Sequence, residues 1–308
     1  MDDRARFEAF ARLATEQRNP RTLDLDSLAI PELLARLNAE DRTVPEAVER
    51  ELPWIARAVE LVVASFKAGG RLIYVGAGTS GRLGVLDASE CPPTFGSDPA
   101  QVVGVIAGGM GALVRAVEGA EDRADEGEQA MEELRVGPHD TVCGLAASGR
   151  TPYVVAAVER ARARGARTLY ITCTPRASFT LDVDVAICPV VGPEAVMGST
   201  RLKSGTAQKL VCNMLTTTAY IRMGKVYENM MVDLMANSEK LVERGRRTVM
   251  TVTGCAYSDA ADAIEAAGGS VKTALVMLRT GCARDEAERR LAQADGFVRR
   301  AIAAGGTA

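Results

Sequence analysis

Short apolar segments alternate with longer amphipathic ones between residues 71 and 191. The apolar segments lack a strict in–out alternation, which is typical of strands buried on both faces of a parallel sheet. Strands are predicted at 71–75, 101–107, 140–146, 167–173 and 185–191. Helices are predicted to start near Gly81, Gly111, Thr151 and Lys203. This order predicts an α/β fold, a doubly wound parallel sheet flanked by helices and joined by right-handed crossovers.

Helical patterns flank this region on the N-terminal side. Asp26 or Ser27 can cap a helix through residues 28–37. Pro45 suits the first turn of a second helix, whose apolar spacing continues to Gly69. We therefore expect N-terminal helices before the sheet.

The pattern changes again near residue 240, where glycines separate short helices predicted at 258–267, 270–279 and 284–303. The expected organisation has three parts. They are an N-terminal helical segment (1–60), a sheet domain (61–239) and a small C-terminal three-helix module (240–308).

Composition narrows the function classes. The net charge of −3 lacks the excess of positive charge that is typical of nucleic-acid-binding proteins. The apolar runs are too short to span a membrane, and the first residues do not read as a signal peptide, so a cytoplasmic protein is expected. Seven scattered cysteines lack metal-ligand spacing and are expected to be buried reduced thiols; no metal site is predicted. The single histidine, His139, lies in a Pro/Gly turn and is expected to be a loop residue.

Two loops of small, hydroxyl-bearing residues are the candidate ligand site. The first, 76–81, follows the first predicted strand, and the second, 146–151, follows the third. Backbone N–H groups at a helix start attract anions, and loops at the carboxyl ends of parallel strands converge. The expected binding residues are Gly78, Thr79, Ser80, Gly81, Ser148, Gly149, Arg150 and Thr151. The alternative is that the hydroxyls only cap helices.

The ligand class follows from what the loops lack. Glycines 76, 78 and 81 satisfy G-x-G-x-x-G, but a dinucleotide site needs an acidic residue at the end of the next strand, which here ends Ala107-Gly108-Gly109. A P-loop is excluded because no Gly-Lys-Ser/Thr follows. A sugar phosphate is favoured. Ser204 and Lys209 lie in a third segment that can supply hydroxyls and positive charge, or can form a capped interface helix.

Five segments then carry a family resemblance: 76–84, 87–96, 146–153, 204–209 and 224–233. Together they resemble the N-acetylmuramic acid 6-phosphate etherases, which belong to the sugar isomerase (SIS) domain superfamily. The run Ala88-Ser89-Glu90-Cys91-Pro92-Pro93 is the most specific. The resemblance covers nearly the whole chain.

The resemblance implies a cytoplasmic carbon–oxygen lyase of cell-wall recycling, without a cofactor. It removes D-lactate from carbon 3 of N-acetylmuramic acid 6-phosphate by elimination followed by addition of water. Glu90 matches the proton donor to the departing oxygen, and Glu121 matches the second catalytic glutamate, naturally the base. A homodimer is implied, with the helix after Ser204 as the candidate interface and Lys203 or Lys209 reaching a ligand. The alternatives are a sugar-phosphate isomerase and a non-catalytic sugar-phosphate-sensing regulator.

Overall fold

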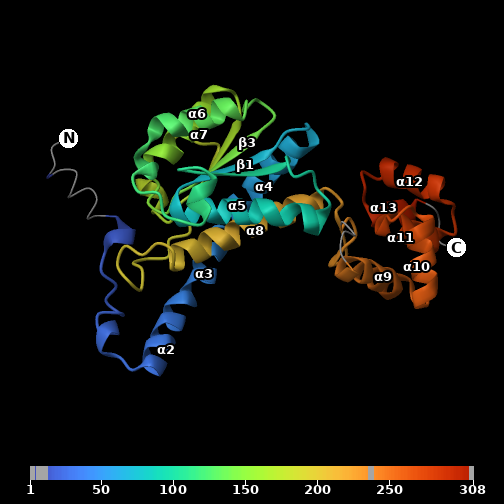
Figure 1. Ribbon diagram of the computed structural model, residues 1–308, viewed down its shortest axis with the longest axis horizontal. Helices are drawn as coiled ribbons and strands as arrows, with labels where there is room; N and C mark the ends of the chain where they lie inside the picture. Colours follow the sequence, from blue (N-terminus) through green and yellow to red (C-terminus); the bar gives the residue numbers. More distant parts are fainter. Residues whose placement is uncertain (1–3, 5–12, 235–238, 305–308) are drawn as a thin grey trace. The chain divides into compact units, whose positions relative to one another are not determined.

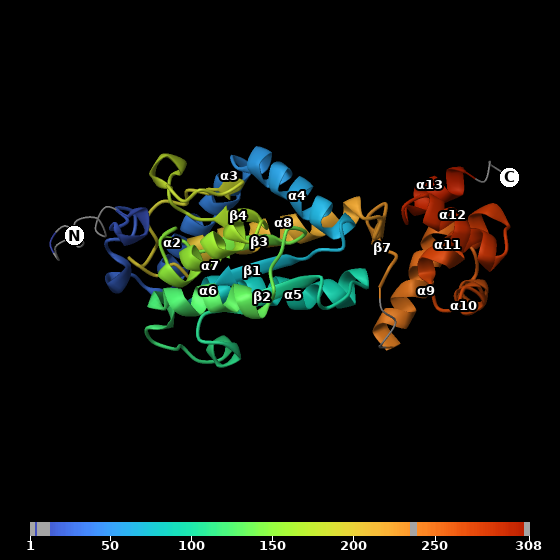
Figure 2. The same cartoon turned by 90° about the horizontal axis from the view of Figure 1, so that it is seen from above.

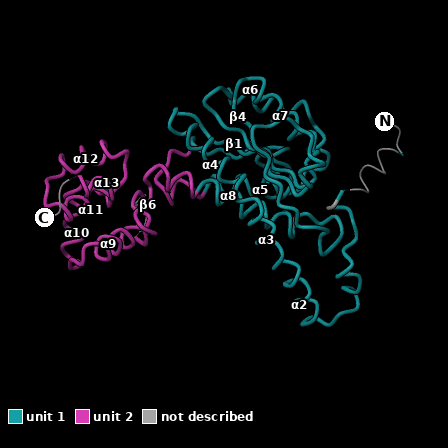
Figure 3. The backbone as a smooth tube through the Cα atoms, turned by 180° about the vertical axis from the view of Figure 1, so that it is seen from behind, with its two compact units in different colours: residues 1–89, 100–216 teal, residues 90–99, 217–308 magenta. Residues whose placement is uncertain are grey.

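The computed structural model describes residues 4, 13–234 and 239–304 (Figure 1). The chain divides into two compact units (Figure 3). The sheet unit comprises residues 1–89 and 100–216, and the C-terminal unit comprises residues 90–99 and 217–308. The N-terminal helices therefore share a unit with the sheet, and the second division falls at residue 216 rather than near residue 240.

Five parallel strands form the sheet, in the order β2-β1-β3-β4-β5. Their bounds are β1 Leu72–Gly76, β2 Val102–Ile106, β3 Thr141–Leu145, β4 Arg167–Ile171 and β5 Val185–Ile187. In register, Leu72 of β1 lies opposite Val102 on one side and Thr141 on the other. All five predicted strands are confirmed, and β1 and β3 are neighbours from which the chain proceeds in opposite directions across the sheet.

Helices cover both faces of this sheet (Figures 1 and 2). They are α4 Leu52–Lys67, α5 Gly78–Phe95, α6 Ala124–Glu133, α7 Pro152–Ala163 and α8 Lys203–Arg222. Two helices precede them in the chain, α2 Ile30–Asp41 and α3 Thr43–Glu49, and α2 extends away from the sheet (Figure 1). Ile73 and Val75 face a core shared with Met131 of α6 and Val154 of α7. On the opposite face, Tyr74 packs closely against Gly84 of α5 and its hydroxyl reaches α8. The fold is the doubly wound α/β sheet that the hydrophobic pattern predicts.

Two helix predictions for this unit are wrong in instructive ways. The helix expected at Gly111 is only a 3-10 turn, Met110–Leu113, and α6 begins at Ala124. Gly109 (φ +71°) precedes the turn at 110–113, and Gly119 (φ +73°) precedes a second 3-10 turn at 120–122; both adopt left-handed backbone, which a continuous helix does not allow. The long helix expected after Pro45 is instead two helices, α3 and α4, because Pro53 starts a new first turn.

The C-terminal unit has its own core. Its helices are α9 Glu239–Thr253, α10 Tyr257–Ala266, α11 Val271–Thr280, α12 Arg284–Gln293 and α13 Val298–Ala303. A short hairpin, β6 Val226–Tyr227 and β7 Met230–Met231, precedes them. Val249, Leu275 and Ala287 are among its buried residues. Helices at 258–267 and 270–279 are confirmed, but the third predicted helix is two, because Asp295 and Gly296 adopt positive φ.

No helix in the described ranges is both long enough and apolar enough to cross a bilayer.

Candidate active site

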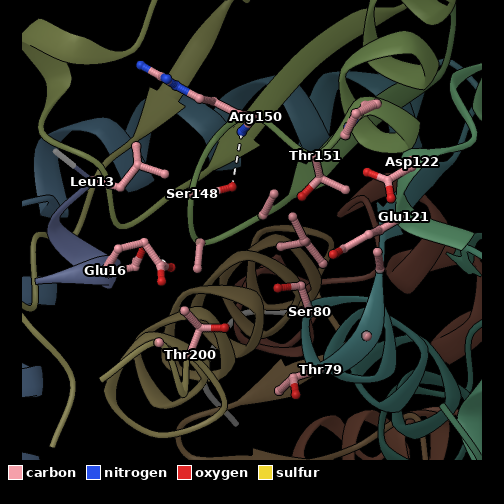
Figure 4. Close-up of a pocket in the computed structure, with 18 residues that line it drawn as sticks. Leu13, Glu16, Thr79, Ser80, Glu121, Asp122, Ser148, Arg150, Thr151 and Thr200 are labelled. Atoms are coloured by element: carbon pink, nitrogen blue, oxygen red, sulfur yellow. Dashed lines mark hydrogen bonds between the residues drawn. The ribbon is translucent and has the colours of Figure 1, made fainter. Parts of the chain in front are cut away.

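The main pocket lies at the carboxyl ends of β1 and β3, the point where the strand order reverses and where ligands bind in such sheets. Its volume is about 760 Å³. The residues that bear polar side chains around it are Thr15, Glu16, Thr79, Ser80, Glu121, Asp122, Ser148, Arg150, Thr151 and Thr200 (Figure 4). The sheet topology therefore brings the two predicted loops to one cavity.

Two helices begin at the pocket wall. Helix α5 starts at Gly78, and α7 starts at Pro152 directly after Thr151. Proline suits this first position, because its missing N–H would be unbonded anyway. The partial positive charge of two helix N-termini, together with the hydroxyls of Ser80 and Ser148, favours an anion here.

Six of the eight predicted loop residues line the pocket: Gly78, Thr79, Ser80, Ser148, Arg150 and Thr151. Gly81 and Gly149 do not, and the structure shows why both positions need glycine. A Cβ on Gly81 would lie 2.6 Å from Ile106 Cγ1, and Gly149 has φ +69° with Thr172 Oγ1 close by. These two glycines shape the loops, whereas the other six present atoms to the cavity.

Ser80 is held from behind by α8. Its hydroxyl donates to Gln208 Oε1 at 2.8 Å, and Gln208 is only 1% exposed. Gln208 Nε2 is buried without a hydrogen-bond partner. The Gln208 amide therefore controls how the Ser80 hydroxyl hydrogen is directed.

Glu121 lies at the pocket edge. It belongs to a 3-10 turn, Ala120–Asp122, and its side chain points toward the cavity alongside Asp122 (Figure 4). Gly119 precedes this turn in left-handed conformation, which reverses the chain so that Ala120 packs inward. The structure thus brings Glu121 together with the anion loops.

Glu90 is placed differently. It is exposed on α5, ten residues after Ser80, which corresponds to about 15 Å along a helix axis. It is not among the residues that line the pocket.

Asp87 in the same motif is buried, and its carboxylate accepts hydrogen bonds from Tyr74 Oη at 3.0 Å, Asn213 Nδ2 at 2.7 Å and Thr216 Oγ1 at 3.2 Å. Burial raises the pKa of Asp87, against the effect of these donors. Asp87 thus ties α5 to β1 and α8.

The third predicted segment caps a helix. Ser204 is fully buried, and its hydroxyl donates to Glu194 Oε1 at 2.7 Å. The backbone N–H groups of Lys203 and Ser204 donate to the same carboxylate, which satisfies the first turn of α8. Neither Ser204 nor Lys209 lines the pocket, and Lys209 is exposed on α8. Lys203, expected to reach a ligand, instead pairs with Glu40 at 2.9 Å, with both side chains buried.

The N-terminal segment contributes residues that sequence reasoning missed. Thr15 and Glu16 line the pocket, and Figure 4 shows Glu16 across the cavity from Glu121. Three hydrogen bonds attach this segment to residues 193–198: Gly198 N to Thr15 O, Asn19 Nδ2 to Pro193 O, and Thr22 Oγ1 to Ala195 O. No motif marks Glu16, so only the fold could reveal it.

Metal-ligating side chains and thiols are the other groups that could carry chemistry. No group of three or more metal-ligating side chains occurs among the described residues. All seven cysteines are free thiols, as predicted, and five are buried. Burial raises the pKa of Cys173 to about 12 and that of Cys188 to about 11, which keeps both thiols protonated and unreactive.

The parallel sheet with a hydroxyl-rich pocket at its switch point defines an SIS-type α/β domain. Residues 121–218 match the profile of the SIS domain, and residues 54–162 match that of the glucokinase regulatory protein N-terminal SIS domain. A solved phosphoheptose isomerase from Neisseria gonorrhoeae is 18% identical over 62% of this chain and 98% of its own, with a TM-score of 0.45.

Curated relatives are far more similar. The N-acetylmuramic acid 6-phosphate etherase of Salinibacter ruber is 62% identical over 90% of this chain and 89% of its own length. The etherase of Serratia proteamaculans is 57% identical over 86% of this chain and 90% of its own. The chain belongs to the N-acetylmuramic acid 6-phosphate etherase family.

Proposed function

We propose that this chain cleaves the D-lactyl ether of N-acetylmuramic acid 6-phosphate, giving N-acetylglucosamine 6-phosphate and D-lactate in cell-wall recycling. One structural observation carries the proposal beyond family membership. A single pocket combines two helix N-termini, which suit a phosphate, with a glutamate at its edge, Glu121.

The phosphate group anchors the substrate in the pocket. The hydroxyls of Ser148 and Thr151 together with the backbone amides of Thr79 and Ser80 at the start of α5 hold it, and the binding energy places carbons 2 and 3 of the sugar beside Glu121. Ring opening exposes an aldehyde at carbon 1, which acidifies the proton on carbon 2. The Glu121 carboxylate removes that proton, and the electron pair forms the carbon 2–carbon 3 double bond as the ether oxygen leaves.

The departing alkoxide needs a proton, because it is a poor leaving group. We assign this donor to Glu90. Water then adds to carbon 3 of the unsaturated aldehyde, its hydroxyl bonding there while one proton returns to carbon 2. The sum is ether plus water giving alcohol plus D-lactate.

A second copy of the chain supplies Glu90 in this proposal. Glu90 is exposed and about 15 Å along α5 from Ser80, so a neighbouring protomer is the natural source of the acid for a given pocket. Closed two-fold pairing makes both sites complete. Seven free cysteines suit the reducing cytoplasm, where we place the protein.

Mixing two inactive variants tests the shared site. Glu90→Gln and Glu121→Gln homodimers are each expected to release no lactate. After subunit exchange, half of the dimers are mixed, and one of the two sites in each mixed dimer has both glutamates, so activity returns to about one quarter of wild type. One variant is labelled with nitrogen-15, so that native mass spectrometry distinguishes mixed dimers from homodimers. No recovery of activity despite exchange demonstrated in this way means that each chain uses its own Glu90.

The assay for the function itself is release of D-lactate, detected with D-lactate dehydrogenase. Glu90→Gln is expected to abolish release while N-acetylglucosamine 6-phosphate still binds. An isomerase would instead convert an aldose to a ketose, and a sensing regulator would bind the sugar phosphate unchanged. Full activity in Glu90→Gln contradicts the assignment of the acid.

A further inference from the structure

A second, smaller cavity adjoins the main pocket. Its volume is about 180 Å³, and it shares Ala77, Gly78 and Glu121 with the main pocket. Small apolar side chains make up much of its wall, from Ala107, Ala112, Ala116, Val117 and Ala120. Glu121 therefore stands where the two cavities meet.

One basic side chain lines this cavity, that of Arg82. Arg82 is half-buried on the first turns of α5, and its Nε donates to the carbonyl of Leu113 at 3.1 Å. This bond fixes the guanidinium against the loop that leads to Glu121, while its terminal nitrogens have no hydrogen-bond partner among the described residues. A guanidinium held in this way offers two parallel N–H donors, the arrangement that binds a carboxylate.

The other charged residues on the cavity wall are glutamates. Glu118 is exposed, so water screens its charge, whereas Arg82 is partly desolvated. Glu121 is the base of the proposed reaction. The cavity thus pairs one partly buried cation with a wall of alanines.

We propose that this cavity binds the D-lactyl group of the substrate, with its carboxylate on Arg82 and its methyl group against the alanines. The inference rests on the proposed function. At liquid density, where a water takes about 30 Å³, the cavity holds about six non-hydrogen atoms, as many as lactate has. The ether bond to carbon 3 then lies at the junction, beside Glu121.

This assignment explains how the site distinguishes substrate from product. N-acetylglucosamine 6-phosphate lacks the lactyl group, so it leaves the small cavity empty and makes no contact with Arg82. Arg82 is therefore a specificity-determining residue whose effect depends on the carboxylate of the ligand.

Arg82→Met tests this. Arg115→Met is the matched control, because Arg115 lies two residues after Leu113, whose carbonyl accepts the Arg82 hydrogen bond, but does not line the cavity. A charged hydrogen-bonded pair contributes about 1.5–3 kcal/mol, so Arg82→Met is expected to raise KM for the muramic acid phosphate about 10- to 150-fold. The dissociation constant of N-acetylglucosamine 6-phosphate, measured by calorimetry, is expected to change less than about twofold. Free D-lactate should inhibit wild type and Arg115→Met but not Arg82→Met.

Two results for Arg82→Met overturn the proposal. One is an equal loss of affinity for both sugar phosphates, and the other is an unchanged KM for the muramic acid phosphate. Ala112→Leu provides a second variant that fills the cavity while leaving the Arg82 guanidinium in the chain, and it should weaken only ligands that carry the lactyl group. Calorimetry of the 3-O-ethyl ether of N-acetylglucosamine 6-phosphate, which has no carboxylate, completes the design, because Arg82→Met should not affect its affinity. Calorimetry with these ligands requires no turnover, unlike KM and inhibition by lactate, so the lactyl cavity and the lyase activity can fail separately.

Discussion

Removing the charge of Glu40 should destabilise the sheet unit in a pH-dependent way. The Glu40 carboxylate is 2% exposed and accepts hydrogen bonds from Arg21, Lys203 and Asn19. These partners, Arg21 first, lower the pKa of Glu40 to about 2. The native state therefore favours the ionised form, and one pKa unit corresponds to about 1.4 kcal/mol, which gives about 3 kcal/mol of stabilisation at pH 7.

The direction of the pH dependence follows from the lowered pKa of Glu40. This stabilisation is fully present above the unfolded pKa of about 4.5 and is lost as pH falls toward 2. Glu40→Gln removes it and leaves Lys203 buried without a counter-charge, so the loss at pH 7 should be about 3–5 kcal/mol. Between pH 7 and pH 3 the difference in free energy of unfolding between wild type and variant should decrease by about 2 kcal/mol.

Urea unfolding, monitored by tryptophan fluorescence, measures this difference in free energy of unfolding. The chain has one tryptophan, Trp54, in α4 of the sheet unit, where Arg176 stacks over its ring at 4.0 Å. Its emission therefore reports the unit that contains Glu40. Glu49→Gln, an exposed glutamate on α3, is the control and should change stability by less than about 0.5 kcal/mol. A gap between wild type and Glu40→Gln that stays constant from pH 7 to pH 3 would refute a depressed pKa for Glu40.

Three further substitutions test the pocket. Gln208→Leu removes the acceptor that holds the Ser80 hydroxyl hydrogen away from the pocket, which frees it to donate to the phosphate, so KM should fall about 3- to 10-fold with little change in kcat; a raised KM would contradict this. Glu16→Gln removes a negative charge from the wall of the proposed anion pocket and should lower KM for the substrate about two- to fivefold; an unchanged or raised KM would contradict this. Gly81→Ala should destabilise the protein by at least about 1 kcal/mol in urea, because its Cβ would collide with Ile106; an unchanged midpoint would contradict the packing described for the loop.

The sheet was predictable because its physical cause is local. β1 and β3 are buried along their whole length, as strands covered on both faces of a parallel sheet are, and each is followed directly by a loop that starts a helix. The region after β2 was not predictable in the same way. There, glycines with positive φ at 109 and 119 replace a helix with two short turns, and a glycine's φ cannot be read from its identity alone.

The candidate site likewise contains residues positioned by local sequence, which could be predicted, and residues positioned by long-range contacts, which could not. Ser80 and Ser148 could be predicted because strand, loop and helix are adjacent in sequence. Glu16 could not, because the contacts that bring it to the pocket join segments more than 170 residues apart. Ser204 looked like a ligand because hydroxyls suit anions, but its buried partner, Glu194, becomes visible only in the fold.

The central claim is that the chain breaks the bond between carbon 3 of the sugar and the lactyl oxygen, and that water supplies the oxygen that replaces it on carbon 3. Turnover of N-acetylmuramic acid 6-phosphate in water enriched in oxygen-18, with mass spectrometry of both products, tests it most directly. The account predicts one labelled oxygen on carbon 3 of N-acetylglucosamine 6-phosphate and unlabelled ether oxygen in D-lactate. Label at the hydroxyl of lactate, or no lactate at all, would contradict it.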